Sequence, residues 1–472
     1  MLFVLLFMAA NLAAQAFVKD IKKKNAVMLA FSLVFYAWAG VRYVALLLGL
    51  TWVCWRCGLA VERATDIRGK RRALAVAVTL TLVTLGVFKY TGFVLQNVRE
   101  FIGWPETVPE IVLPVGLSFY SFQLISYVAD VYRGRTEAQK KYWLLLLYAG
   151  LFHQCVAGPI VRYSDVNDDI LHRRVKAKEL SQGIGRFCVG LAKKAVLANG
   201  CATVADSLLV SSAETLAATS VLGVWLGAFA YTLQIYLDFS AYSDMAIGMG
   251  LMCGFHYKEN FNYPYMAGSV TDFWRRWHIS LSSFFRDYVY IPLGGNRCGT
   301  GRQVFNMLVV WGLTGLWHGA GWNYILWGLY YFVFLVLEKH IFKDNPSQSK
   351  SPLRHMAVLV VVCLGWVLFK FEDFSLLTVA LKGLVGGNGN ALADYSAWIL
   401  LKNNLYFLLF CCVASTPLFK NIGRIVKNLG RQSALCLYID GIWEVLCPVL
   451  LLVISMMALA GNSYNPFLYF QF

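Results

Sequence analysis

The sequence predicts an all-α protein that crosses a membrane many times, and three observations carry this prediction. Of the 472 residues, 58% are hydrophobic and 14% are charged, and the mean hydropathy is +0.56, whereas soluble domains are about half apolar and a quarter charged. Apolar runs recur from Leu2 to Ala460 without a linker rich in Ser, Pro or Gly. Basic clusters separate many of these runs. We therefore expect one polytopic membrane domain over residues 1–472.

Candidate spans follow from length, because a helix needs about 20 apolar residues to cross the hydrocarbon core. We expect roughly 10–12 crossings, and the number depends on which of the short runs cross. The candidates are Leu2–Val18, Ala26–Ala39, Tyr43–Ala60, Ala73–Leu95, Ile111–Val131, Trp143–Ile160, Gln182–Ala198, Leu216–Leu237, Ala241–Phe255, Phe305–Trp317 with Trp322–Leu337, Met356–Phe371, Ala397–Leu418 and Ala434–Ala460.

The basic clusters suggest an orientation in the cell membrane, since Lys and Arg concentrate in cytoplasmic loops. Placing them inside gives alternating crossings almost everywhere and leaves both termini outside the cytoplasm. Between residues 143 and 255 a short apolar run could enter and leave on one side, and such re-entrant backbone must be buried in protein or line a cavity. Met1 leads straight into apolar residues, so we expect no cleavable signal. The clusters are Lys19–Lys24, Arg63–Arg72, Arg133–Lys141, Lys339–Arg354 and Lys420–Arg431.

Charge and cysteine usage exclude several other classes. The net charge of +16 fits basic cytoplasmic loops better than nucleic-acid binding, because no soluble segment interleaves a basic face with exposed aromatics. Cys54 and Cys57 have redox-motif spacing, but they lie in an apolar run and no second pair completes a zinc site. The sequence contains no HExxH motif and no cluster of His and Cys at ligand spacing, so we expect no metal.

The segment Lys258–Arg302 is basic, aromatic and too poor in continuous apolar sequence to be an ordinary span. Trp274, Trp277, His278 and Leu281 recur at helical spacing, and Thr271 or Asp272 could cap the helix that they imply. Its arginines Arg275, Arg276 and Arg286 suit a phosphate-rich ligand approaching from the cytoplasm. An interfacial helix with these arginines on lipid headgroups is the alternative.

His318 is the most informative ionisable residue, because it lies inside an apolar hairpin with the sequence GLWHGAGWN. Ionisable residues within a membrane are functional candidates by default, and an imidazole can remove a proton from a hydroxyl near neutral pH. Small neighbours would let a substrate approach the ring. A histidine that only packs against a neighbouring helix is the alternative.

Other polar residues support weaker hypotheses. Asp238 and Asp244 are six residues apart, so they do not share a helix face well. Either could orient a histidine, pair with an arginine or cap a helix. The Gly-rich run Leu293–Arg302 lacks the order of a phosphate-binding loop. His256 reads as structural, while three other histidines beside Lys and Arg read as solvated loop residues: His172, His340 and His355.

At these motifs the sequence resembles the membrane-bound O-acyltransferase family, and in particular its bacterial branch that acetylates alginate and peptidoglycan. The matching stretches together are specific, although no single one would be. They are LPVGLSFYSFQLISYVADVYRG from Leu113, AGPIVRY from Ala157, DFSAYSDMAIGMG from Asp238, ENFNYPY from Glu259, the WRRWHISLSSFFRDYVYIPLGGNR stretch, GLWHGAGWNYILWG from Gly315 and the C-terminal tail.

The resemblance implies a ring of transmembrane helices with re-entrant segments around a central tunnel, into which acyl-CoA enters from the cytoplasm. His318 matches the central catalytic histidine of the family, and His278 matches its second signature position. Arg275, Arg276 and Arg286 would then line the donor's phosphates, from the cytoplasmic or interfacial segment 258–302.

The tail Asn465–Phe472 resembles an F-x-Y-F-x-F motif whose tyrosine carries the acyl group outward, which assigns this role to Tyr469 in the extracytoplasmic tail 465–472. A phenol becomes a good nucleophile only when a base removes its proton, and His318 would be that base. An aromatic anchor at the membrane interface is the alternative.

The expected function is therefore transfer of an acyl group from a cytoplasmic CoA thioester to an extracytoplasmic polysaccharide or peptidoglycan. We expect the acyl group to be acetyl and the donor to be acetyl-CoA. The resemblance implies a separate esterase-like partner outside the cytoplasm for the final transfer, besides contact with membrane lipids. Transfer of D-alanine to teichoic acid is an alternative within the class, and a transporter or lipid flippase is one outside it, although we find no inverted repeat.

Overall fold

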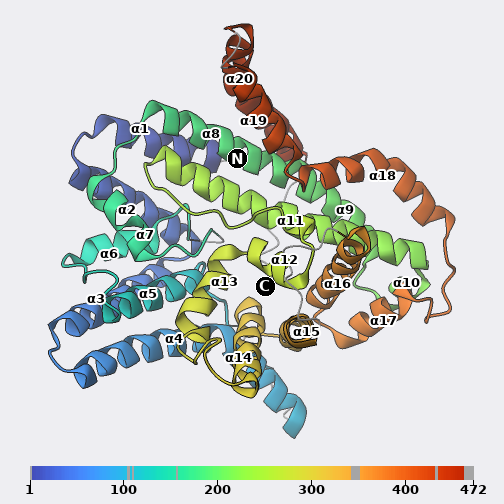
Figure 1. Ribbon diagram of the computed structural model, residues 1–472, viewed down its shortest axis with the longest axis horizontal. Helices are drawn as coiled ribbons and strands as arrows, with labels where there is room; N and C mark the ends of the chain where they lie inside the picture. Colours follow the sequence, from blue (N-terminus) through green and yellow to red (C-terminus); the bar gives the residue numbers. More distant parts are fainter. Residues whose placement is uncertain are drawn as a thin grey trace. The chain divides into compact units, whose positions relative to one another are not determined.

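The computed structural model describes residues 3–103, 107–108, 111–155, 158–341, 351–430 and 434–461. All regular elements in these ranges are helices (Figure 1), which confirms the all-α prediction. Their bounds are η1 Phe3–Met8, α1 Ala9–Phe17, α2 Ile21–Ala39, α3 Val41–Arg63, α4 Ile67–Ile102, α5 Leu117–Tyr132, α6 Tyr142–Gly150, α7 Tyr163–His172, α8 Ala177–Ala192, η2 Lys193–Ala198, α9 Asn199–Leu208, α10 Ala213–Ala218, α11 Val221–Met252, η3 Pro264–Met266, α12 Val270–Arg276, α13 Ile279–Phe285, η4 Arg286–Tyr290, α14 Thr300–His318, α15 Trp322–Val336, η5 Leu337–Ile341, α16 Pro352–Lys370, α17 Phe374–Leu384, α18 Tyr395–Ala414, α19 Leu418–Gly430 and α20 Ala434–Ala460.

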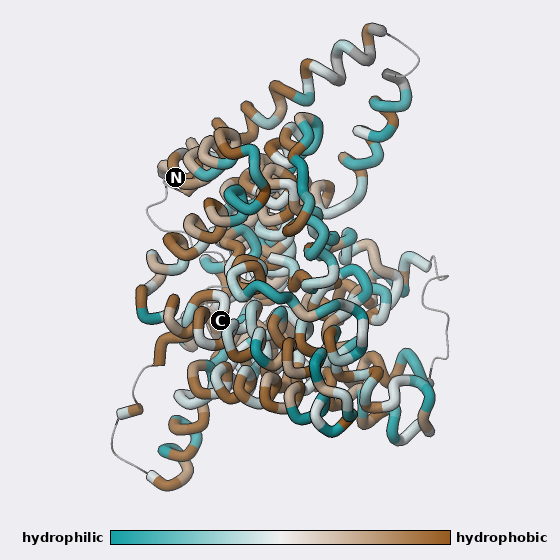
Figure 2. Tube along the Cα trace, turned by 90° about the vertical axis from the view of Figure 1, so that its left-hand side faces the viewer, coloured by the Kyte–Doolittle hydropathy of each residue, from teal (hydrophilic) through white to brown (hydrophobic). Residues whose placement is uncertain are grey.

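Within the described ranges, seven helices are long and apolar enough to cross a membrane, so the protein is a multi-pass membrane protein. Figure 2 shows hydrophobic residues along much of the helical tube and hydrophilic residues at many turns. Other expected spans correspond to shorter or more polar helices, such as α2 and the α14–α15 pair. The ring and the tunnel remain predictions. The seven are Val41–Arg63, Ile67–Ile102, Ala177–Leu208, Val221–Met252, Pro352–Lys370, Tyr395–Ala414 and Gly441–Ala460.

The described chain forms two compact units. Unit 1 comprises Met1–Phe187, Met245–Glu259 and Ser283–Val289, and unit 2 comprises Cys188–Asp244, Asn260–Ser282 and Tyr290–Phe472. No linker separates them, because α8 and α11 each begin in one unit and end in the other.

In unit 1, helix α5 is surrounded by α3, α4, α6 and α7. All of its residues from Leu117 to Val131 are buried, as expected of a helix whose whole circumference meets protein. The helix begins at Gly116, whose φ of 75° lies in the left-handed region, and a Cβ there would lie 2.4 Å from the carbonyl oxygen of Cys155. The apolar stretch expected from Ile111 therefore becomes helical only after this glycine.

Helix α11 joins two segments that the sequence analysis treats as separate spans, Leu216–Leu237 and Ala241–Phe255. The polar stretch between them stays helical because both of its carboxylates find lysine partners in η2. Lys194 Nζ lies 2.6 Å from Asp238 Oδ1, and Lys193 Nζ lies 2.6 Å from Asp244 Oδ2. Neither aspartate caps a helix, and the ion-pair partners are lysines rather than the expected arginine.

The Lys194–Asp238 pair is deeply buried, with side chains 8% and 4% exposed. Removing one partner of such a pair leaves an uncompensated charge, which costs much more than the pair itself contributes. Lys194 lies in η2 and Asp238 lies in α11, so this ion pair holds η2 against α11.

In unit 2, α14 and α15 pack along one another, and α15 also packs on α12 and α16. Buried aromatic side chains fill the space among these four helices. Trp274 of α12 lies 5.4 Å, centroid to centroid, from Trp327 of α15, and Trp277 lies 4.7 Å from Trp366 of α16. This aromatic core fixes the ends of α12 and α14, where the two histidines of interest lie.

The segment 258–302 contains short helices rather than a span, in agreement with its composition. Ser269, not Thr271 or Asp272, caps α12, since its hydroxyl accepts from Asp272 N at 2.9 Å. The carboxylate of Glu338 from η5 accepts from Val270 N and Thr271 N at 2.7 and 2.8 Å. These bonds satisfy donors of the first turn that would otherwise lack partners.

We predict that Lys194→Met lowers the free energy of unfolding by about 3 kcal/mol, because it removes the charged partner of the buried Asp238 carboxylate. Thermal unfolding of the full chain in detergent measures the change. Lys427→Met is the matched control, since Lys427 pairs with Glu444 in an exposed ion pair, and such pairs contribute little. Equal midpoints for the two variants would refute the prediction.

Candidate functional site

His318 is the last residue of α14 and is followed by a short turn into α15. Its side chain is buried, with only 6% of the residue exposed. The imidazole contacts Trp317, Trp327 and Phe369, with ring centroids 5.0, 5.0 and 5.5 Å away. The ring is therefore enclosed on several sides by aromatic side chains. Burial of a polar group in apolar surroundings costs free energy of folding, so a histidine at such a place is a candidate functional residue.

Glycines on both sides of His318 allow this enclosure. A Cβ on Gly319 would lie 2.0 Å from Cε2 of Tyr324, and one on Gly315 would lie 2.3 Å from the Tyr324 carbonyl oxygen. The sequence suggested that small neighbours leave room for a substrate. In the structure this space is filled by Tyr324, so the glycines serve the close packing of α14 on α15.

Two hydrogen bonds fix the start of α15 to the end of α16. The hydroxyl of Tyr324 donates to Glu372 Oε1 at 3.0 Å, and the amide of Asn323 donates to the carbonyl oxygen of Phe369 at 3.2 Å. The rings of Phe369 and Tyr324 also contact each other, with centroids 5.0 Å apart. The side chains around His318 are therefore held by contacts among α14, α15 and α16.

His278 lies in a break between α12 and α13, where the sequence analysis expects a continuous helix through Leu281. Its φ is 44°, in a region that residues other than glycine adopt at a cost of about 1–3 kcal/mol and mostly near functional sites. The residue is completely buried. Its Nδ1 lies 3.2 Å from Asn260 Oδ1, and its ring meets the Phe239 ring edge-on at 4.7 Å.

The structure brings His278 and His318 together within unit 2. Their ring centroids are 6.5 Å apart, and Trp317 contacts both rings. Burial lowers the pKa of His278 to about 3, so this imidazole is neutral near pH 7. Two imidazoles at this separation can both contact one small reacting group, and a neutral imidazole can accept or donate a proton there.

The three arginines expected to bind the donor have different surroundings. Arg275 is exposed on α12. Arg276 donates from Nε to Asp272 Oδ1 at 2.9 Å within the same helix. Arg286 belongs to unit 1, whereas Arg275 and Arg276 belong to unit 2.

Asp287 in unit 1 accepts from Arg286 Nε and from Arg162 Nη2, each at 2.7 Å. Burial opposes ionisation of this carboxyl, but the two arginines outweigh burial and hold the pKa of Asp287 below its usual range. The guanidinium of Arg162 also lies 5.2 Å from the centroid of the Tyr288 ring. The side chain of Arg286 remains 63% exposed, which leaves it accessible to a ligand.

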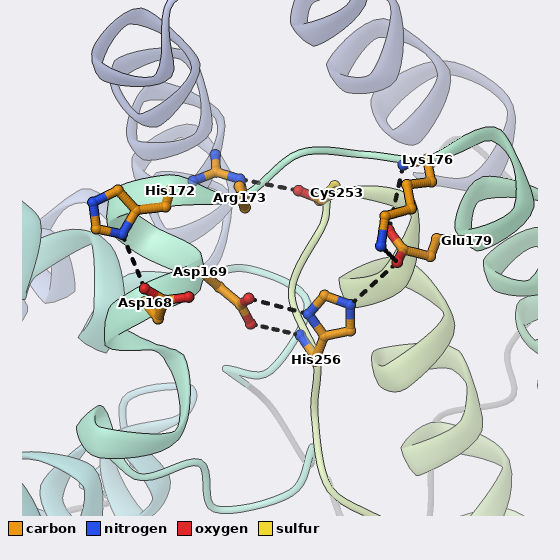
Figure 3. Close-up of polar contacts among 8 residues, drawn as sticks. All are labelled: Asp168, Asp169, His172, Arg173, Lys176, Glu179, Cys253 and His256. Atoms are coloured by element: carbon orange, nitrogen blue, oxygen red, sulfur yellow. Dashed lines mark hydrogen bonds and ion pairs between the residues drawn. The ribbon is translucent and has the colours of Figure 1, made fainter.

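His256 and its neighbours in unit 1 form a polar cluster that ties α7 and α8 to the chain after α11 (Figure 3). Asp169 accepts from the backbone N of His256 at 2.9 Å and lies 3.1 Å from its Nδ1. Nε2 of His256 lies 3.7 Å from Glu179 Oε1. These contacts fit the structural role expected of His256. His172 lies exposed beside Asp168.

Among the described residues, no group of three or more His, Cys, Asp or Glu side chains could hold a metal ion.

His355 differs from its expectation as a loop residue, because it lies on α16 and its Nδ1 is 3.0 Å from the carbonyl oxygen of Ala267. Tyr469 and the rest of the tail 465–472 lie outside the described residues.

Comparison with known proteins decides the family. The sequence profile described as "MBOAT, membrane-bound O-acyltransferase family" matches residues 144–371, which include both histidines. The probable alginate O-acetylase of Pseudomonas putida is 37% identical over 473 residues, covering 95% of this chain and 94% of the relative. This chain belongs to the membrane-bound O-acyltransferase family. It is an O-acyltransferase and uses an acyl donor.

Two other proteins are also similar to this chain. The peptidoglycan O-acetyltransferase of Helicobacter pylori is 30% identical over 496 residues, covering 97% of this chain and 93% of the relative. The teichoic acid D-alanyltransferase of Bacillus subtilis is 27% identical over 300 residues, covering 60% of this chain and 74% of the relative.

Sequence reasoning missed the residues that support the two histidines in this acyltransferase. Asn260 lies 18 positions before His278, and Glu372 lies 48 positions after Tyr324. Neither separation has a local periodicity that would suggest contact. Asn260 lies inside a quoted motif, but the motif did not indicate which of its residues faces the histidine.

We predict that Gly319→Ala lowers acyl transfer strongly and destabilises the protein by about 1–3 kcal/mol, the usual cost of overpacking. The added methyl group meets Tyr324, which its bond to Glu372 holds in place. Transfer rate and thermal unfolding in detergent measure the two effects. Gly312→Ala is the control on the same helix, because a Cβ there meets no heavy atom within 4 Å. The prediction fails if the two variants behave alike.

Proposed function

We propose that this acyltransferase moves an acetyl group from acetyl-CoA, at the cytoplasmic side of the inner membrane, to hydroxyl groups of an extracytoplasmic polysaccharide or peptidoglycan. The observation that carries the proposal is the buried pair His278 and His318, 6.5 Å apart between ring centroids, in a chain similar to alginate and peptidoglycan O-acetyltransferases over nearly its whole length.

His318 is the proposed general base. Its imidazole takes the proton from an acceptor hydroxyl, and the oxygen attacks the carbonyl carbon of the thioester. The new C–O bond forms as the C–S bond breaks. The thiolate of CoA leaves with the electron pair and takes up the proton that His318 received, which restores the neutral imidazole. The enclosure of His318 supports this role, because exclusion of water strengthens the electrostatic interactions between the imidazole and a reacting group.

His278 assists at the same carbonyl. As a neutral, buried imidazole it can donate or accept one hydrogen bond without bringing a charge into the site. The donor's phosphates would contact Arg275, Arg276 and Arg286 at the cytoplasmic face. The exposure of Arg275 and Arg286 supports such contacts, since guanidinium groups bind phosphates well where they can be reached.

Tyr469 is the proposed acyl carrier, in a tail that we place outside the cytoplasm together with the N-terminus. His318 would deprotonate the phenol, the acetyl group would pass to its oxygen, and an esterase-like partner would complete the transfer to the polymer. An exchange of this kind, with an acyl-enzyme between two half-reactions, explains how one thioester inside the cell can serve an acceptor outside it.

The acceptor is proposed from the relatives. Alginate and peptidoglycan are named for the relatives that cover nearly the whole chain, whereas D-alanyl transfer to teichoic acid is named for relatives that cover 60% of it or less. The first two acceptors are therefore favoured, and an aminoacyl carrier protein is the donor to test as the second candidate.

We predict that His318→Ala lowers acetyl transfer from labelled acetyl-CoA by about 100-fold or more, the usual effect of losing a general base. Purified full-length protein in detergent, with thiol release as the readout, measures the rate. His172→Ala should keep the wild-type rate, because His172 is exposed and lies outside the proposed site. A wild-type rate in His318→Ala would contradict the mechanism.

We further predict that Tyr469→Phe abolishes covalent labelling of the protein by acetyl-CoA, because the variant lacks the phenol oxygen. Intact mass and peptide mapping measure the label. The matched control is Tyr464→Phe, five residues earlier in the sequence, which should be labelled normally. A labelled Tyr469→Phe variant would place the carrier elsewhere.

A further inference from the structure

Asn260 occupies a central position around His278. Its backbone carbonyl accepts from Ile279 N at 2.9 Å, on the far side of the histidine. Asn262 N donates to the carbonyl oxygen of Arg276 at 2.9 Å, so the segment 260–262 bonds to the chain both before and after His278. This two-sided attachment stabilises the left-handed backbone that separates α12 from α13.

The side chain of Asn260 adds a second set of contacts. Its Oδ1 lies 3.1 Å from Ser280 N, 2.8 Å from Ser280 Oγ and 3.2 Å from His278 Nδ1. Its Nδ2 lies 3.2 Å from Ser243 Oγ on α11. The residue itself is completely buried, so water does not compete for these bonds.

One of these contacts settles which way the amide points. The backbone N–H of Ser280 can only donate, so the amide atom beside it must be the oxygen. The opposite orientation would place an NH₂ group against an N–H group and leave two buried donors facing each other, which is costly.

The orientation of the amide in turn settles the tautomer of His278. Nδ1 also lies 3.4 Å from Ser280 Oγ, but the hydroxyl hydrogen of Ser280 points to Asn260 Oδ1 at 2.8 Å. An amide oxygen can only accept, so Nδ1 must carry a hydrogen to bond to it. In the neutral ring the lone pair then lies on Nε2. That atom is buried, and it has no hydrogen-bond partner among the described residues.

We propose that Asn260 is a positioning residue, which holds His278 with its proton on Nδ1 and so presents the lone pair of Nε2 to the reacting group. The inference rests on the proposed function insofar as His278 acts on substrate. The tautomer itself follows from the hydrogen bonds. Groups that orient a functional imidazole in this way are known to change its chemistry without touching the substrate.

The direct test is nitrogen NMR of the full chain in lipid, labelled with ¹⁵N-histidine, because the two ring nitrogens have different shifts when protonated and unprotonated. The signal of His278 is assigned by its absence in His278→Gln. We expect protonated Nδ1 and unprotonated Nε2 in the wild-type protein, and a mixture of tautomers in Asn260→Ala. Protonated Nε2 in the wild type would overturn the proposal.

The kinetic test separates positioning from folding. Asn260→Ala should lower kcat about 10- to 100-fold, the range for groups that orient a functional imidazole, with a much smaller change in KM. Asn262→Ala is the matched control, since the Asn262 side chain is exposed and the substitution keeps the backbone N–H that bonds to Arg276. It should keep the wild-type kcat. Equal kcat values in the two variants would contradict the proposal.

Asn260→Asp keeps the accepting oxygen and nearly the same shape, so it should restore the tautomer and most of kcat. Its carboxylate also stabilises the imidazolium, which raises the pKa of His278. The acid limb of the pH–rate profile should therefore move to higher pH, an effect that a merely structural role would not produce. If His278→Gln is fully active, the proposed function of His278 fails, while the NMR result still decides the tautomer.

Discussion

Burial of two imidazoles against aromatic side chains is the constraint on which this part of the molecule depends. The ring nitrogens of a buried histidine need hydrogen-bond partners, because burial of an unpartnered polar group costs free energy. Aromatic side chains enclose both rings. Trp317, Trp327 and Phe369 surround His318, while Phe239 and Trp317 contact His278. The shared contact with Trp317 means that a change in one enclosure affects the other.

The backbone around the two rings explains how they are held. His318 ends a helix because Gly319 and Gly315 allow Tyr324 to pack where any side chain would collide. His278 interrupts a helix because Asn260 bonds to the chain on both sides of it. One ring is thus fixed by close packing and the other by hydrogen bonds, and both sites include backbone that a regular helix would not supply. Such irregular backbone is tolerated at membrane depth only where protein or a cavity surrounds it.

The sequence predicted the fold class for physical reasons, and it singled out His318, whose role stays a proposal. Apolar runs long enough to cross a bilayer are a strong signal, and an ionisable residue in an apolar hairpin is conspicuous in a chain with 14% charged residues. It failed where distant partners decide the outcome. Two spans are expected on either side of Asp238–Asp244 because polar residues interrupt the apolar sequence there, but lysines 44 and 51 positions earlier pair with these aspartates inside one helix. The helix expected through His278 is interrupted for the same reason, since the backbone N of Ile279 donates to the carbonyl oxygen of the distant Asn260.

We propose that His278 and His318 act on the same reacting group, and the sharpest test of this proposal is a double-mutant cycle. His278→Gln, His318→Gln and the double variant are compared by kcat/KM for acetyl-CoA in the purified full-length enzyme. Residues that act as a unit are strongly non-additive. If both histidines act on one reacting group, we expect the double variant to be about as slow as the slower single variant. A loss equal to the product of the two single losses would show that the histidines act independently and would contradict the account.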